Sequence, residues 1–228
     1  ASQGMLSRRE VKELITKGRV TIDGTVEKHP ERRVTGEEQI VVAGEPLRVQ
    51  RTLTLMLHKP QGVVSAARDA RDKTVLELVP PEYRRKELFP AGRLDKDTTG
   101  LMILTDDGAL AHDILAPAHH VDKQYLVTLD TPLTEEMRKG FAEGVTLADG
   151  TALSPAEVEA LTPDGLTVKV RLRQGVYHQI KRMFGVYGAG VNALHRDAIG
   201  GLALDPALAP GQWRELSAEE VTAITTGA

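Results

Sequence analysis

The sequence predicts an α+β fold whose central sheet is mixed and largely antiparallel. Predicted strands outnumber predicted helices and do not alternate strictly with them along the chain. The beginning of the chain shows a separate pattern, a short helix followed by a hairpin. We therefore expect a small helix-plus-hairpin module over 1–47, a linker over 48–52 and a larger domain over 53–228.

The predicted module begins with a capping box formed by Ser7 and Glu10. Apolar residues of 11–15 share one helix face, and Gly18 follows at a position typical of a helix end. Asp23-Gly24 then separates two β-prone runs, which strongly indicates a hairpin. A third short strand is expected at 40–42, and the polar stretch 48–51 predicts the linker.

The larger domain has a strand-rich pattern. Helices are expected at 110–115, at 178–187 and after a second capping box at 217–220. In the 178–187 helix, His178, Lys181 and Arg182 share one side. Strands are expected at 53–57, 63–64, 101–105, 125–129, 167–173 and 212–216.

The composition excludes several classes of protein. The chain has no Cys, which rules out disulfides and thiol chemistry, and its longest apolar runs are strand-sized. We therefore expect a cytoplasmic protein without a membrane partner. The net charge is -3, but residues 7–35 carry eight basic and five acidic side chains. This local excess fits either a phosphate-binding surface or an ordinary solvated one.

Residues 90–100 hold the densest cluster of reactive side chains. Asp95, Asp97 and Arg93 lie on a stretch bounded by glycines, beside the predicted buried strand 101–105. An ordinary polar turn is one interpretation. A second is a calcium loop, because the acids follow the EF-hand spacing, although Pro90 and Gly92 oppose an entering helix. A third is a phosphate-accepting aspartate, which would need a continuous apolar strand before it.

Several short motifs in this region and beyond it resemble those of one enzyme family. The loop carries Gly-Arg-Leu-Asp at 92–95, Thr-Thr-Gly-Leu at 98–101 and Thr-Asp-Asp-Gly at 105–108. Further blocks at 59–62, 123–127 and 175–183 agree in order, with His58 replacing an expected Asn and Val176 an expected Arg. Together they resemble the pseudouridine synthases, and blocks at 195–201 and 210–216 resemble the RsuA type, which modifies ribosomal RNA.

The resemblance extends to the start of the chain. Residues 7–10 and 18–24 are similar to a small RNA-binding module shared with a ribosomal protein of the small subunit. The family normally has a complete helix before Ser7, which residues 1–6 do not supply.

The resemblance implies a pseudouridine-synthase catalytic domain in which Asp95 is the nucleophile. Tyr125 would stack on the flipped uracil, and Lys181 would pair with Asp95 in a dry pocket. Asp97 would only cap its own loop. The implied RNA-binding residues are Arg93, Arg8, Arg9, Lys12, Arg19, His178 and Arg182.

The resemblance also implies the substrate and the partners. It favours uridine-516 of 16S rRNA, as naked RNA or in a small-subunit assembly intermediate. We expect no cofactor, because the isomerisation has no redox step, and no metal, because His112, His119, His120 and His178 lack a recognised ligand spacing. A monomer is the default expectation. The alternatives are a 23S rRNA enzyme of the same family and a non-catalytic ribosome-associated RNA-binding protein.

Overall fold

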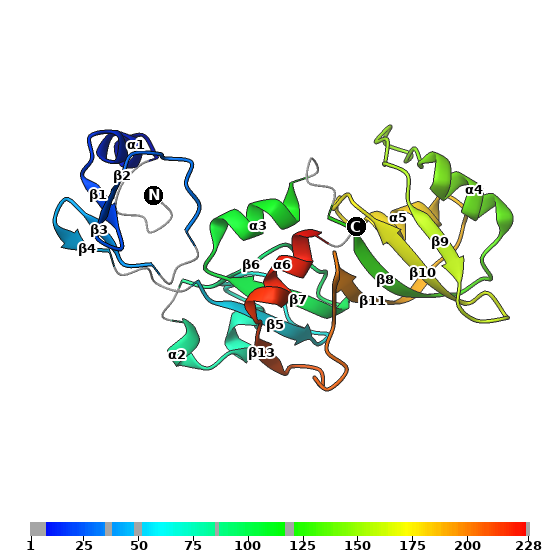
Figure 1. Cartoon of the computed structure of the whole chain (residues 1–228). Coiled ribbons are helices and arrows are strands. Elements are labelled where there is room, and N and C mark those ends of the chain that lie inside the picture. The colour runs from blue at the N-terminus through cyan, green and yellow to red at the C-terminus, as the bar shows by residue number, and fades with distance from the viewer. Residues whose placement is uncertain (1–7, 35–37, 48–51, 85–86, 117–120, 227–228) are drawn as a thin grey trace. The chain divides into compact units, whose positions relative to one another are not determined.

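The computed structural model describes residues 8–34, 38–47, 52–84, 87–116 and 121–226. Contacts within the chain divide it into two compact units, 1–52 and 53–228 (Figure 1). The expected linker residues 48–51 and the first capping residue, Ser7, lie outside the described residues. No helix in the described ranges is long and apolar enough to cross a membrane.

The first unit is a small helix-and-sheet module. Its apolar core contains Val20, Ile22 and Ile40, against which Leu14 and Ile15 of the helix pack. Asp23 and Gly24 both have positive φ, so the expected Asp-Gly hairpin turn is confirmed. The antiparallel sheet has the order β2-β1-β3-β4. The elements are α1 (Arg8–Thr16), β1 (Val20–Ile22), β2 (Thr25–Glu27), β3 (Ile40–Val42) and β4 (Glu45–Pro46).

The second unit is built on one sheet, whose described strands number nine. The main order is β13-β5-β7-β11-β8-β10-β9, with β6 paired to β7 and β12 paired to β11. Among these strands, only β7 and β11 run parallel to each other. The predicted α+β class with a mixed, largely antiparallel sheet is therefore confirmed. The strands are β5 (Thr54–Lys59), β6 (Phe89–Pro90), β7 (Thr99–Thr105), β8 (Lys123–Leu129), β9 (Glu157–Ala160), β10 (Thr167–Leu172), β11 (Val191–Ile199), β12 (Leu202–Ala203) and β13 (Trp213–Glu215).

Three helices of this unit, α3, α4 and α6, begin at side chains that accept hydrogen bonds from their first backbone N–H groups. The Asp107 carboxylate accepts hydrogen bonds at the start of α3, and the Thr134 hydroxyl does so at the start of α4. Ser217 and Glu220 form the expected capping box at α6. The helices are η1 (Val75–Leu78), α2 (Pro81–Arg84), α3 (Gly108–Leu115), α4 (Glu135–Glu143), α5 (Gln179–Gly185) and α6 (Ala218–Thr226).

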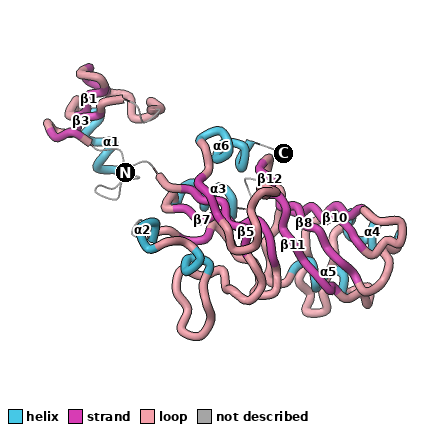
Figure 2. The backbone as a smooth tube through the Cα atoms, turned by 90° about the horizontal axis from the view of Figure 1, so that it is seen from below, coloured by secondary structure: helices cyan, strands magenta, loops and turns pink. Residues whose placement is uncertain are grey.

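The two faces of the sheet bury separate apolar clusters. Leu55 and Leu57 of β5 face the cluster that contains residues of α4 and α5, whereas Met56 faces the cluster that contains residues of α3 and α6. Successive side chains of a strand point to opposite faces, so a strand covered on both sides becomes a continuous apolar run. Figure 2 shows α6 and α5 on opposite sides of the strands.

The structure differs from the sequence interpretation at several elements, and α4 and β9 are among those that were not expected. Residues 63–64 do not begin a strand, because Val64 makes only an isolated bridge to Thr74. The nine-residue strand β11 was not expected, since it contains polar and charged residues such as His195, Arg196 and Asp197 and lacks an apolar run. It nevertheless lies in the middle of the sheet, between β7 and β8.

A glycine permits the contact between β7 and β11. Gly100 lies opposite Arg196 and has a φ of +109°. A Cβ atom at this position would lie 2.1 Å from the Arg196 carbonyl oxygen. Only glycine therefore fits here, and the loop that precedes β7 enters the sheet directly beside β11.

Candidate active site

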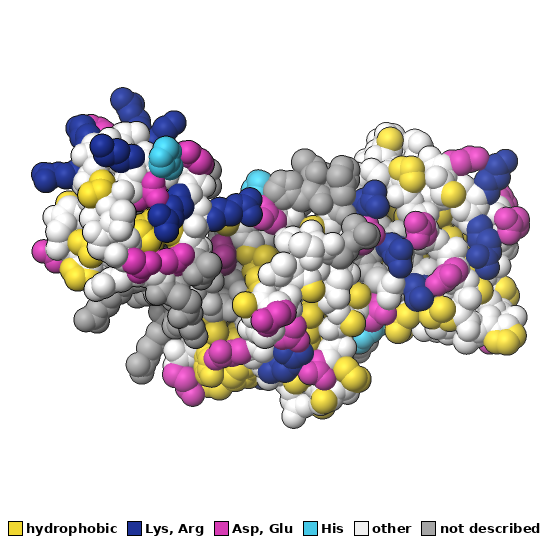
Figure 3. Space-filling model, viewed as in Figure 1, with side chains coloured by type: hydrophobic (Ala, Val, Ile, Leu, Met, Phe, Trp, Pro, Cys, Tyr) yellow, Lys and Arg dark blue, Asp and Glu magenta, His cyan; other side chains and the backbone are white. Residues whose placement is uncertain are grey.

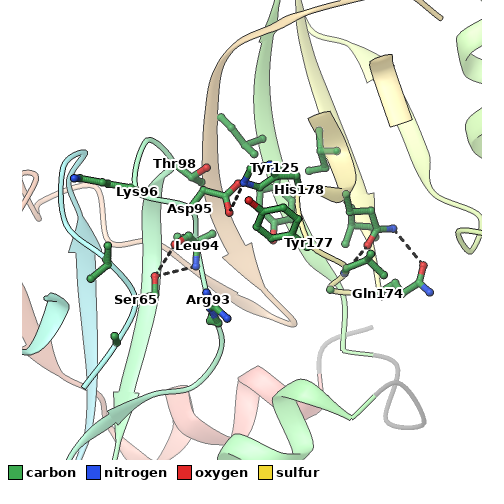
Figure 4. A pocket seen from close by; sticks show the side chains of 18 of the residues that line it. Ser65, Arg93, Leu94, Asp95, Lys96, Thr98, Tyr125, Gln174, Tyr177 and His178 are labelled. Carbon is green, nitrogen blue, oxygen red and sulfur yellow. Dashed lines mark hydrogen bonds and ion pairs between the residues drawn. The ribbon is translucent and has the colours of Figure 1, made fainter. Parts of the chain in front are cut away.

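A pocket of about 790 Å³ lies on the second unit, where the loop between β6 and β7 meets the start of α5 (Figure 4). Its walls come mainly from three stretches, 64–66, 93–96 and 174–180. The other lining residues are Asp69, Thr98, Tyr125 of β8, Leu172 and Leu194. Sites assembled from loops on a rigid sheet are typical of enzymes.

Asp95 contributes the carboxylate at the centre of this pocket. Its Oδ1 lies 3.4 Å from Nε2 of His178, and its Oδ2 lies 3.8 Å from Nζ of Lys181. The Asp95 side chain is 27% exposed, so the carboxylate remains open to a ligand. Figure 4 shows it directed toward the space bordered by Tyr125, His178 and Tyr177.

The backbone of the Asp95 loop is held by a buried lysine. Lys59, at the end of β5, has no solvent exposure. Its Nζ donates to the carbonyl oxygens of Asp95 at 3.0 Å, Thr98 at 2.7 Å and Pro60 at 3.1 Å. Burial lowers the pKa of Lys59 to about 8, against the opposing effect of the nearby carboxylates of Asp97 and Asp95. The sequence placed Lys59 only within a turn motif, and its role was missed.

Ser65 fixes the residue that precedes Asp95. Its Oγ donates to the Leu94 carbonyl oxygen at 2.8 Å and accepts from the Leu94 N–H at 2.9 Å. The sequence interpretation missed this residue too, because a single serine near a turn carries no distinctive signal. Lys59 thus holds the backbone carbonyl of Asp95, and Ser65 holds the backbone of the preceding residue, Leu94.

Lys181 lies at the site but is shared between two acids. Its Nζ donates to both carboxylate oxygens of Asp97, at 2.7 and 2.9 Å, and lies farther from Asp95. The expected ion pair between Lys181 and Asp95 is thus longer than the one between Lys181 and Asp97. Asp97, which was expected only to cap its loop, therefore also binds Lys181. The Lys181 hydrogen bond is the main cause that lowers the pKa of Asp97. The Lys181 side chain is 25% exposed and that of Asp95 27%, so this pair is partly open to solvent.

Tyr125 forms part of the pocket's inner wall. It lies on β8 directly opposite Arg196 of β11, is 9% exposed and belongs to the same apolar cluster as Ile180. An aromatic ring at this depth offers a flat apolar surface to a planar ligand. The site therefore combines the open Asp95 carboxylate, the Lys181 ammonium 3.8 Å from it and a buried aromatic ring.

Comparison with known proteins identifies the family. The profile described as RNA pseudouridylate synthase matches residues 53–185, and the S4 domain profile matches residues 1–40. The chain belongs to the RNA pseudouridylate synthase family. The expected α+β catalytic domain and the small N-terminal module thus correspond to the two matched regions.

Relatives of this pseudouridine synthase family member extend over nearly the whole chain. It is 43% identical to the uncharacterized RNA pseudouridine synthase YtzG of Bacillus subtilis (strain 168), over 97% of this chain and 94% of the relative. It is 41% identical to ribosomal small subunit pseudouridine synthase A of Escherichia coli (strain K12), over 98% and 96% respectively. A solved crystal structure titled as a pseudouridylate synthase shares 37% identity and a TM-score of 0.73, over 96% of this chain and 94% of that one. These similarities confirm the RsuA type.

The predicted RNA-binding residues of this synthase lie in different surroundings. Arg93 is exposed at the pocket and His178 faces Asp95, whereas Arg182 is hydrogen-bonded to Asp149 and does not line the pocket. The Arg8 side chain lies outside what the structure describes. In the first unit, Figure 3 shows Lys and Arg side chains gathered on the visible face. The exposed basic residues there are Arg9, Lys12, Lys17, Arg19, Lys28, Arg32 and Arg33.

The geometry does not favour the calcium interpretation of the Asp95 loop. An EF-hand loop connects two helices, but β6 and β7 flank this one. Within the described ranges, no three His, Asp or Glu side chains converge in a way that could hold a metal ion. His119 and His120, which were weighed as metal ligands, lie outside the described residues.

Proposed function

We propose that this pseudouridine synthase isomerises one uridine of 16S rRNA, with Asp95 as the nucleophile. The observation that carries the role of Asp95 is its open carboxylate, 3.8 Å from the Lys181 ammonium, at the centre of a pocket that also holds Tyr125. The 16S assignment is supported by the near full-length similarity to the small-subunit enzyme of Escherichia coli. Uridine-516 is the target expected for this subgroup.

The reaction breaks the N1–C1′ bond of the target uridine, turns the uracil and joins its C5 to C1′. The C5 proton is lost and N1 gains one, so the atoms balance without any cofactor. An ionised Asp95 stabilises the electron-poor C1′ atom, by a covalent bond or by electrostatic attraction. Lys181 places its ammonium 3.8 Å from the Asp95 carboxylate, within ion-pair distance of the reacting group.

The target base must leave its stack before this chemistry. Tyr125 provides the surface on which the flipped uracil stacks, and Arg93 holds the RNA backbone at the pocket. His178 and Arg182 contribute further contacts on the α5 side, and Arg8, Arg9, Lys12 and Arg19 contribute them from the N-terminal module. The module covers 1–47, the linker 48–52 and the catalytic domain 53–228. The protein acts as a monomer on 16S rRNA or on a small-subunit assembly intermediate.

The test is a pseudouridine map of 16S and 23S rRNA transcripts and of small-subunit assembly intermediates after incubation with the protein. Pseudouridine is detected as a carbodiimide-dependent stop in reverse transcription. We expect one new stop in 16S rRNA. A stop in 23S rRNA instead would reject the 16S assignment, and no stop with folded protein would favour the non-catalytic RNA-binding alternative.

A matched pair of variants tests the nucleophile. Asp95→Asn keeps the shape of the side chain but not its charge, and should lower the rate at least about 10³-fold. Asp97→Asn, two residues further along, should lower it less than about tenfold, because Lys181 remains within reach of Asp95. Conversion by Asp95→Asn at the wild-type rate would disprove the mechanism.

A further inference from the structure

Tyr177 is an aromatic side chain that the fold leaves in solvent. It is 70% exposed, the largest value among the exposed large apolar side chains of the described residues. It lines the same pocket as Asp95 and lies at its edge, two residues before the α5 helix begins. An exposed ring at the edge of a ligand pocket indicates a contact with something outside the protein.

The inner face of Tyr177 is already occupied by another ring. Tyr177 and His178 stack with their centroids 3.8 Å apart and their planes inclined by 18°. His178 has the left-handed conformation, with φ +50° and ψ +32°, which is uncommon for a residue with a side chain. This backbone conformation is maintained at a pocket, where local strain commonly serves function.

Hydrogen bonds of two glutamine side chains hold the segment that carries Tyr177. The buried Gln179 accepts a hydrogen bond from the Val176 N–H at 3.1 Å and reaches Gln174 at 3.4 Å. Gln174 in turn accepts from the Ser154 N–H at 3.0 Å. The ring of Tyr177 is therefore presented on an ordered segment, which reduces the entropy lost when a ligand stacks on it.

The two tyrosines of the pocket lie at different depths. Tyr125 is 9% exposed and Tyr177 is 70% exposed, while His178 lies between Tyr177 and the Asp95 carboxylate. Figure 4 shows Tyr177 in front of His178, on the side of Asp95 that faces Gln174. In the proposed function, the target base stacks on Tyr125, which lines the same pocket as Asp95. The outer face of Tyr177 then remains available to a second base.

We propose that Tyr177, backed by His178, stacks on an RNA base adjacent in sequence to the target uridine. This inference rests on the proposed function, since it requires an RNA substrate at Asp95. Every base has a π face, so stacking recognises an unpaired neighbour without reading its hydrogen-bonding edge. Arg93, exposed on the 93–98 side of the pocket, is placed to hold a phosphate of the same strand. Tyr177 is thus a substrate-positioning residue, distinct from the groups that act on the target nucleotide.

The test uses a 16S rRNA fragment that carries the uridine identified by the pseudouridine map. An abasic ribose is placed in turn on its 5′ and 3′ sides. With the intact fragment, Tyr177→Ala should lower kcat/KM about 5- to 150-fold, mainly through KM, as expected for the loss of one base–aromatic stack. Tyr177→Phe should stay within about twofold of wild type, because it keeps the ring. Leu161→Ala, another exposed apolar residue outside the pocket, should have no effect.

The abasic fragments separate stacking from a purely structural role. With the abasic ribose at one of the two positions, the kcat/KM of wild type should fall by about the factor that Tyr177→Ala causes on intact RNA. Tyr177→Ala acting on that abasic fragment should show no larger fall in kcat/KM than either change alone. An equal additional loss for Tyr177→Ala on both abasic fragments would overturn the proposal, as would wild-type kinetics of Tyr177→Ala on intact RNA. Thermal unfolding of each variant checks that it is folded. Failure of the proposed function is distinguishable, because wild type would then form no pseudouridine in any fragment.

Discussion

At the scale of single residues, the position of Asp95 depends on backbone contacts more than on its side-chain partners. Its nearest side-chain partners, His178 and Lys181, lie 3.4 and 3.8 Å away, whereas its backbone carbonyl accepts from Lys59 at 3.0 Å. A buried ammonium is costly unless its donors are satisfied, and here several carbonyl oxygens satisfy them. Lys59 therefore orients the proposed nucleophile while leaving its carboxylate open to substrate.

Lys59→Met should lower both stability and activity. The variant keeps the length of the side chain but leaves the carbonyl oxygens of Asp95 and Thr98 without their donor, at a cost of about 1–3 kcal/mol in unfolding free energy. Lys123 is a matched control, because it is also buried and donates to the carbonyl oxygens of Ile114 and Val121, outside the pocket. Lys123→Met should lose similar stability in urea titrations but keep kcat within about twofold. A normal kcat for Lys59→Met would contradict the role given to Lys59.

The difference in unfolding free energy between wild type and Lys59→Met should depend on pH. Burial lowers the pKa of Lys59 to about 8 in the folded protein, from its ordinary value of 10.5. Between these values the unfolded chain binds more protons than the folded one, so this residue's contribution makes folding more favourable as the pH rises. The unfolding free energy of wild type minus that of Lys59→Met should therefore increase from pH 8 to pH 10. Over the same interval, the kcat of wild type should fall as the Asp95 loop loses the ammonium, and that of the variant should not.

At the scale of elements, the parallel pairing of β7 and β11 depends on Gly100. Gly100→Ala would place its Cβ 2.1 Å from the Arg196 carbonyl oxygen, at a φ of +109°. We expect it to destabilise the protein by more than about 1 kcal/mol in urea titrations, and to reduce activity because the Asp95 loop leads into this strand. Gly108→Ala is the control: no atom lies within 4 Å of its added Cβ, and it should stabilise α3 by about 0.4–1 kcal/mol. Equal effects of the two substitutions would show that the close approach is not required.

The sequence predicted those elements whose burial is visible as a local pattern. β5 and β7 are continuous apolar runs, β10 alternates, and the Asp-Gly turn identified the first hairpin. β11 escaped prediction because it lies centrally yet carries His195, Arg196 and Asp197. The Arg196 side chain is buried and donates to the Leu101 carbonyl oxygen at 2.8 Å, a tertiary contact that no local pattern encodes.

At the scale of the whole molecule, the candidate site joins groups that are distant in sequence. Asp95, Tyr125 and Lys181 come from the loop before β7, from β8 and from α5, and the motifs predicted their presence but not their geometry. The position of Lys181 between Asp95 and Asp97, and the support from Lys59 and Ser65, depend on side-chain packing across the sheet. Such contacts become visible only when the fold is known.

Charged side chains are distributed unevenly along the whole chain. The net charge is -3, yet exposed basic residues are concentrated in the first unit. If Arg9, Lys12 and Arg19 contact phosphates, replacing all of them with Ala should raise KM for 16S rRNA while leaving kcat at saturating RNA unchanged. Each lost phosphate contact also flattens the salt dependence, so the slope of log affinity against log salt should change by about 2–3.

Lys17→Ala serves as the control for this triple variant, because Lys17 is exposed on the same unit but is ion-paired with Glu13. Its removal should change the slope by less than about 1, since the pair already neutralises much of its charge. An unchanged slope in the triple variant would place RNA binding in the catalytic domain alone. The basic residues of the first unit would then be a solvated surface, which is the other interpretation that their charge allows.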